Sequence, residues 1–130
     1  MTPISELTNA ELDELIFKLQ GWVKLQPPAY PKWQHPGIDG TKLWFEDYIP
    51  SPTTDPRYAM ELLKEMEVAH KDGWEFSCEH STMDGLDPLK WRLWIYRFTN
   101  DEHDYRHHEA VTDEFLRGVS ELYAEWKGEK

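Results

Sequence analysis

The sequence predicts an α+β fold, in which three helices are layered with a small, mostly antiparallel sheet as an α-β-α sandwich. Amphipathic segments at about 8–20, 56–71 and 108–126 repeat apolar residues at helical spacing. Residues 73–82 alternate in the manner of a strand, and residues 90–99 form a second strand that is apolar on both faces. A two-sided apolar strand together with three amphipathic helices is typical of this layered class.

The first helix has the clearest boundaries. Thr8 and Glu11 have the spacing of a capping box, in which each side chain hydrogen-bonds the backbone of the other residue. Gly21 is a natural stop for the helix. The expected apolar face consists of Leu12, Leu15, Ile16 and Leu19. Residues 22–25 follow as a candidate short strand.

The second helix follows a long segment without regular signals. Asp55 is a good N-cap, and Pro56 suits the first helical position because its missing N–H is not needed there. Residues 27–54 are rich in both proline and aromatic residues. This segment is either a ligand-binding loop or a structural segment whose aromatic rings cover one side of the core. The rings of interest there are Trp33, Trp44 and Tyr48.

The sheet is expected to be buried on both sides, because residues 90–99 are apolar on both faces. Arg92 and Arg97 lie on opposite faces of this strand if it is regular. Cys78, in the first strand, is the only cysteine, so no intramolecular disulfide forms, and we expect a buried, inert thiol. The third helix should bury a stripe of Val111, Phe115, Val119, Leu122 and Trp126.

Length and charge limit the classes of function. With 130 residues, the chain has the size of one domain, and we expect a single domain over residues 1–130. A net charge of −11 argues against nucleic acid and anionic membranes as partners. The N-terminus has no signal-peptide pattern, and no apolar run approaches the length of a membrane span. We therefore expect a cytoplasmic protein.

Several short motifs resemble those of a known family. Gly21-Trp22, Pro50-Ser51 before Asp55, and Gly73-Trp74 occur in the order seen in the phage ABA-sandwich domain family, with Ala59 and Leu63 in the second helix. The resemblance covers nearly the whole chain. It implies an origin in phage, a location in the host cytoplasm and helix–sheet–helix layering. Because members are mostly uncharacterised, it implies no activity and no catalytic residues. The link 101–109 departs from the family in its length and histidine content.

Metal binding and catalysis have weak support in the sequence. His103 and His107 would share one face only if the link were helical, and the remaining ligands would have to come from elsewhere in the chain. The sequence has no nucleophile elbow and no glycine-rich phosphate loop. We therefore predict no metal, no cofactor and no catalytic residue, with an enzyme as the less favoured alternative.

A ligand-binding site has more support. Aromatic rings for stacking and cationic groups for phosphate are the combination that a nucleotide-like ligand requires. We predict one pocket between the aromatic loop and the second strand. Its residues are Trp33, Trp44, Tyr48, Arg92, Trp94, Arg97, Arg106, His107 and His108.

Two functions remain open from the sequence. In the first, the protein is a non-enzymatic phage accessory protein that binds a phosphate-bearing small molecule and sequesters a host nucleotide immune signal. In the second, it is an acidic interaction module that inhibits a host protein, with an acidic surface that can imitate nucleic acid. The abundance of large apolar side chains further predicts a homodimer or higher homo-oligomer.

Overall fold

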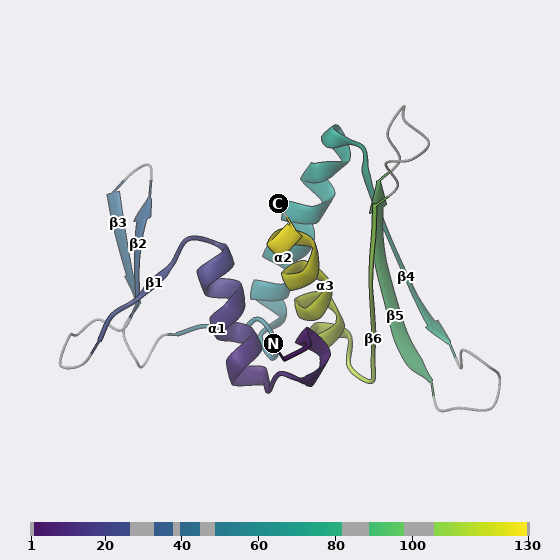
Figure 1. Cartoon of the computed structure of the whole chain (residues 1–130), viewed down its shortest axis with the longest axis horizontal. Helices are drawn as coiled ribbons and strands as arrows, with labels where there is room; N and C mark the ends of the chain where they lie inside the picture. Colours follow the sequence, from purple (N-terminus) through teal and green to yellow (C-terminus); the bar gives the residue numbers. More distant parts are fainter. Residues whose placement is uncertain are drawn as a thin grey trace.

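The helices of this protein lie in one layer between two small sheets (Figure 1). The computed structural model describes residues 2–26, 33–37, 40–44, 49–81, 89–97 and 106–129. The helix layer contains α1 (Asn9–Leu19), α2 (Pro56–Val68) and α3 (Phe115–Glu129), with short 3-10 turns at η1 (Ile4–Glu6) and η3 (Ala69–Asp72). Sheet A has the order β1 (Val23–Lys24), β2 (Trp33–Gly37), β3 (Gly40–Trp44), and sheet B has the order β4 (Trp74–Ser81), β5 (Lys90–Arg97), β6 (Arg106–Thr112).

The predicted class is confirmed, since three helices are layered with small antiparallel sheets in an α+β fold. The structure shows the order of the layers, which is sheet A, then the helices, then sheet B (Figure 1). Sheet B and sheet A flank the helices from opposite sides (Figure 1). Two clusters of buried residues correspond to the two interfaces. The larger one lies between the helices and sheet B, and the smaller one joins Phe17, Trp22 and Trp33 near sheet A.

Helix α1 begins and ends where its local sequence predicts. The Thr8 hydroxyl accepts a hydrogen bond from the Glu11 N–H at 3.1 Å, and the Glu11 carboxylate accepts one from the Thr8 N–H at 2.9 Å. This capping box also lowers the pKa of Glu11. After the helix, Gly21 adopts a φ of 95°, which favours glycine. The predicted boundaries are therefore confirmed.

Helix α2 is likewise defined by its first residues. The Asp55 carboxylate accepts a hydrogen bond from the Arg57 N–H at 2.9 Å, and Pro56 occupies the first position of the helix. Together, α2 and η3 cover the predicted range of 56–71 to within one residue. Gly73 then adopts a φ of 93° and leads directly into β4.

Sheet B is organised around β5, which pairs antiparallel with β4 on one edge and with β6 on the other. Leu93 and Ile95 are fully buried against the helix layer. We call this side the helix face of sheet B. The opposite side, the outer face, carries Trp94 and Tyr96, which are half-buried. Among the described elements, helices cover only the helix face (Figure 1), so these elements do not provide the expected cover on both sides of the sheet.

The start of the third helix was predicted wrongly. Residues 108–112 belong to β6, and α3 begins only at Phe115. The helical spacing of Val111 and Phe115 is coincidental, because pairing with β5 places residues 106–112 in an extended conformation. The Thr112 hydroxyl donates to the Glu114 carbonyl oxygen at 2.7 Å and helps the chain turn into the helix. Val119, Leu122 and Trp126 of the predicted apolar stripe are buried as expected, and Phe115 is partly buried against the same core.

The segment predicted to be irregular contains a hairpin. Strands β2 and β3 pair antiparallel from Trp33 opposite Trp44 to Gly37 opposite Gly40. The candidate strand at 22–25 is confirmed as the two-residue β1, which pairs with β2. A strand with the sequence WQHPG lacks an alternating pattern, so only its pairing within sheet A reveals it.

Candidate functional site

The predicted ligand-binding residues do not form one pocket. Trp33 is 3% exposed and packs edge-on against Phe17 with ring centroids 5.3 Å apart, so it belongs to the smaller core cluster. It lies on the opposite side of the helix layer from β5 (Figure 1). The side chain of Trp44 and the whole of Tyr48 lie outside the described residues. A single pocket joining Trp33 to the β5 residues is therefore excluded.

A second group of predicted residues lies on the outer face of sheet B. Arg92 donates two hydrogen bonds to the Glu109 carboxylate, at 3.0 and 3.2 Å, and also lies 3.6 Å from the Glu79 carboxylate. Its guanidinium carbon lies 5.1 Å from the centroid of the Trp94 ring. His107 is on the same face, with Nε2 3.7 Å from Glu109. The hydrogen bond and charge of Glu109 raise the pKa of Arg92, so this arginine is already matched by carboxylates.

A third group lies at one end of sheet B, on its helix face. Arg97, the last residue of β5, is directly opposite Arg106, the first residue of β6. Residues directly opposite in an antiparallel pair point to the same face with Cβ atoms about 5 Å apart. His108 is on this face two residues further along β6, and Trp74 is paired with Arg97 from the other side. We call Arg97, Arg106 and His108 the cationic end of sheet B.

The surroundings of the cationic end combine an aromatic ring with one carboxylate. The rings of Trp74 and His108 are stacked, with centroids 6.2 Å apart and planes inclined by 29°. Burial raises the pKa of Glu125 on α3, and the neighbouring His108 lowers it by a smaller amount. Glu125 therefore lies within electrostatic range of His108. The arrangement brings two guanidinium groups and an imidazole together on one face, near a partly buried acid.

The structure describes one member of the histidine pair that was considered for a metal. His107 lies in β6, where His107 and His108 project to opposite faces. His107 is therefore not helical, and His103, the other member of the pair, lies outside the described residues. Within the described ranges, no group of three or more His, Cys, Asp or Glu side chains is placed to hold a metal ion.

Sequence reasoning missed a polar cluster inside the helix layer. Glu65 on α2 accepts hydrogen bonds from Tyr123 and Lys127 on α3, and the Tyr58 hydroxyl donates to Gln20. Gln20, Glu65 and Lys127 of this cluster border a cavity of about 320 Å³ that reaches sheet A. The cavity is lined by Leu19, Gln20, Trp22, His35, Glu65 and Lys127. Because the residues come from four elements, no local motif signals them.

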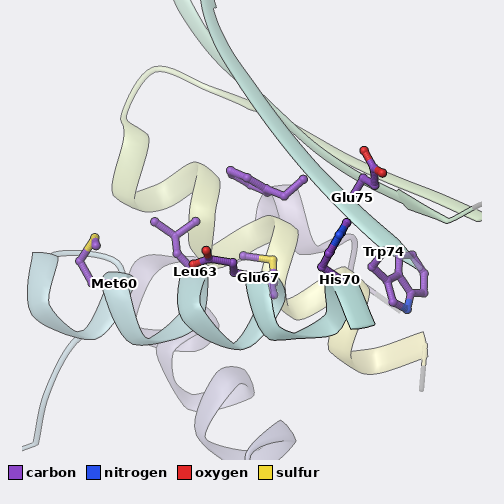
Figure 2. A pocket seen from close by; sticks show the side chains of 8 residues that line it. Met60, Leu63, Glu67, His70, Trp74 and Glu75 are labelled. Atoms are coloured by element: carbon purple, nitrogen blue, oxygen red, sulfur yellow. The ribbon is translucent and has the colours of Figure 1, made fainter. Parts of the chain in front are cut away.

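A largely apolar groove between α2 and β4 was also missed. It has a volume of about 470 Å³, and we call it the α2–β4 groove; its lining residues are Met60, Leu63, Met66, Glu67, His70, Trp74, Glu75 and Phe76. Figure 2 shows Met60, Leu63 and Glu67 along the helix, with Trp74 and Glu75 on the strand. Met60 is 52% exposed, so a large apolar side chain faces solvent at this groove. Cys78 on β4 is exposed as well, so the expectation of a buried thiol is wrong.

Comparisons with known proteins leave the site to be interpreted from its own geometry. No protein family, curated protein or solved structure matches this chain. Of the helices in the described ranges, none is both long and apolar enough to cross a membrane.

Proposed function

We propose that this protein binds a small phosphate-bearing molecule at the cationic end of sheet B and releases it unchanged. The observation that carries the proposal is the direct cross-strand placement of Arg97 and Arg106. Arginine binds phosphate with paired hydrogen bonds. Two guanidinium groups that project from neighbouring strands on one face are placed to contact one phosphate group from two sides.

The neighbouring side chains suit a nucleotide-like ligand. The imidazole of His108 lies on the same face as the two guanidinium groups, and its ring is stacked with the ring of Trp74. The predicted site residues thus divide into two sets with different roles. Arg97, Arg106 and His108 are proposed to contact the ligand, whereas Arg92 serves the ion pair with Glu109. The proposal includes no catalytic step, and these three side chains are assigned to hold the ligand through charge and hydrogen bonds.

The biological role that we propose is sequestration. If the resemblance to phage ABA-sandwich proteins reflects common origin, a small non-enzymatic protein of this kind would act on the host as an accessory factor. A nucleotide-derived immune signal in the host cytoplasm is the class of ligand proposed. Holding it intact would then remove it from its receptor.

Binding can be tested with defined probes. The protein is titrated in a calorimeter with pyrophosphate, ADP-ribose and a cyclic dinucleotide, and bound material is recovered after denaturation. We expect saturable binding of at least one probe and recovery of that probe intact. Recovery of a cleaved product would instead establish an enzyme. An absence of binding across the panel would reject the proposal.

Matched variants locate the site. Loss of one charge-assisted hydrogen bond costs about 1.5–3 kcal/mol, so Arg97→Ala and Arg106→Ala should each weaken binding about 10- to 100-fold. Arg57→Ala removes the same charge at the first turn of α2, the opposite end of that helix from Trp74, and should leave the affinity unchanged. Equal losses in Arg57→Ala and Arg106→Ala would indicate general electrostatic attraction and no specific site.

The outer face of sheet B favours a second candidate function. Trp94 and Tyr96 are half-buried there, and Val111 is 44% exposed, with Glu75 and Glu79 close by on β4. Aromatic rings among acidic groups are typical of protein interfaces with basic partners. In that case Tyr96→Ala would abolish inhibition of a purified host target, whereas Arg106→Ala would have no effect.

A further inference from the structure

We propose that β4 of one copy pairs antiparallel with β4 of a second copy, with Cys78 opposite Cys78 of the partner subunit. The two sheets B would then join into one continuous sheet across a two-fold axis. This interface goes beyond the proposed ligand site and does not depend on it.

The first observation is the position of β4 at the edge of sheet B. The strand spans eight residues, Trp74–Ser81, and pairs with β5 on one side only. Among the described elements, none lies beyond its other side (Figure 1). The unpaired N–H and C=O groups of such an edge are a ready template for another strand.

The second observation is the α2–β4 groove, which runs beside this edge (Figure 2). Met60 and Leu63 line it from the helix, and Phe76 lines it from the helix face of β4. A strand added to the edge of β4 would extend the sheet over these side chains. The partner strand would therefore cover apolar surface at the same time as it completes the backbone hydrogen bonds.

Charge selects one register of this pairing. A two-fold axis perpendicular to the sheet keeps each face of one strand beside the same face of the other. Only two symmetric registers then pair seven residues of each strand, over 74–80 or over 75–81. The first places Glu75 opposite Glu79 of the partner subunit, and like charges directly opposite are destabilising.

The second register avoids this repulsion. It places Glu75 opposite Ser81 of the partner subunit and Ser77 opposite Glu79 of the partner subunit. On the helix face, Phe76 lies opposite His80 of the partner subunit, so two rings meet. Cys78 is then the residue on the two-fold axis. No acidic side chain faces another acidic side chain in this register.

Disulfide formation tests the register directly. Residues directly opposite in an antiparallel pair have Cα atoms about 4.5–5.5 Å apart, which is within the range for a disulfide. Mild oxidation of the native protein with diamide should give a covalent dimer through Cys78, measured by intact mass under non-reducing conditions. The double variant Cys78→Ser, Val111→Cys moves an exposed thiol to β6 and should remain uncrosslinked. A dimer formed equally by both proteins would overturn the proposal.

Substitution of Ser77 tests the same register without a cross-link. Because Ser77 faces Glu79 of the partner subunit twice in each dimer, Ser77→Lys should lower the dimer dissociation constant about three- to tenfold. Ser77→Glu should raise it by a similar factor. Sedimentation measures both constants, and circular dichroism confirms that each variant is folded. Salt should reduce both effects. A monomer of 15.5 kDa for the unsubstituted protein at all concentrations would overturn the proposal, as would equal shifts in the two variants.

Discussion

The Tyr123 hydroxyl on α3 donates a hydrogen bond of 2.6 Å to Oε2 of Glu65 on α2, and so joins the two helices inside the middle layer. The other oxygen of Glu65 accepts a hydrogen bond from Lys127. Tyr123 is fully buried. Glu65 on α2 thus accepts hydrogen bonds from two side chains of α3, and these bonds fix how the two helices pack.

We predict that Tyr123→Phe destabilises the protein. The substitution keeps the ring but leaves Oε2 of the half-buried Glu65 without this donor, which costs about 1–2 kcal/mol of the free energy of unfolding. Urea denaturation measures the change. Tyr96→Phe is the matched control, since its hydroxyl lies at 3.3 Å from Glu75 in an exposed pair, and it should change stability by less than about 0.5 kcal/mol. Equal effects of the two substitutions would contradict this account.

Alkaline pH should unfold the protein through its buried tyrosines. Burial, followed by the hydrogen bond and charge of Glu65, raises the pKa of Tyr123. Burial and the charge of Glu65 also raise the pKa of Tyr58. Tyrosines in the unfolded chain release their protons near about pH 10. Above that pH the unfolded state binds fewer protons than the folded state, so the free energy of unfolding falls as pH rises.

The pH dependence can be assigned with a variant. In Tyr123→Phe, the loss of stability above pH 10 should be less steep than in the unsubstituted protein, because one of the two shifted groups has been removed. Below pH 10, these tyrosines should contribute no slope in either protein. Thermal unfolding followed from pH 8 to pH 11.5 measures both ranges, and identical alkaline slopes would reject the assignment.

Two glycines in α3 should respond in opposite directions to alanine. A Cβ at Gly118 would lie 2.6 Å from Leu93 Cδ1 and 2.8 Å from Thr112 Oγ1, so Gly118→Ala should destabilise by about 1–3 kcal/mol. At Gly128 the nearest atom is Leu19 Cδ2 at 3.9 Å. Gly128→Ala should therefore stabilise the helix by up to about 1 kcal/mol. Thermal denaturation distinguishes them, and a stabilising Gly118→Ala would mean that α3 does not approach sheet B this closely.

We predict that the fold does not depend on a metal ion. The described residues contain no group of three potential ligands, and structural metal sites require about four. Dialysis against EDTA should leave the melting temperature unchanged. A large loss of stability that one specific metal restores would contradict the prediction.

The types of the functional residues could be predicted from the sequence, but their neighbours in space could not. The sequence predicts one pocket because aromatic rings together with cationic groups suit a nucleotide-like ligand. Because successive side chains of a strand point to opposite faces, His107 on β6 lies on the outer face and His108 lies on the helix face. The opposite orientation of Arg92 and Arg97 was predicted from the same rule and is confirmed. The neighbours of each residue depend on strand register, which no short motif in this sequence specifies.

Local sequence is enough to predict the features that act within one turn of the chain. Thr8 with Glu11 and Asp55 with Pro56 define helix starts through hydrogen bonds and backbone geometry that span three residues or fewer. Only the tertiary structure decided that residues 106–112 form a strand and that Arg97 faces Arg106. Pairing with β5 supplies backbone hydrogen bonds that outweigh a weak local helical pattern, and this pairing joins residues further apart in the chain than one helical turn.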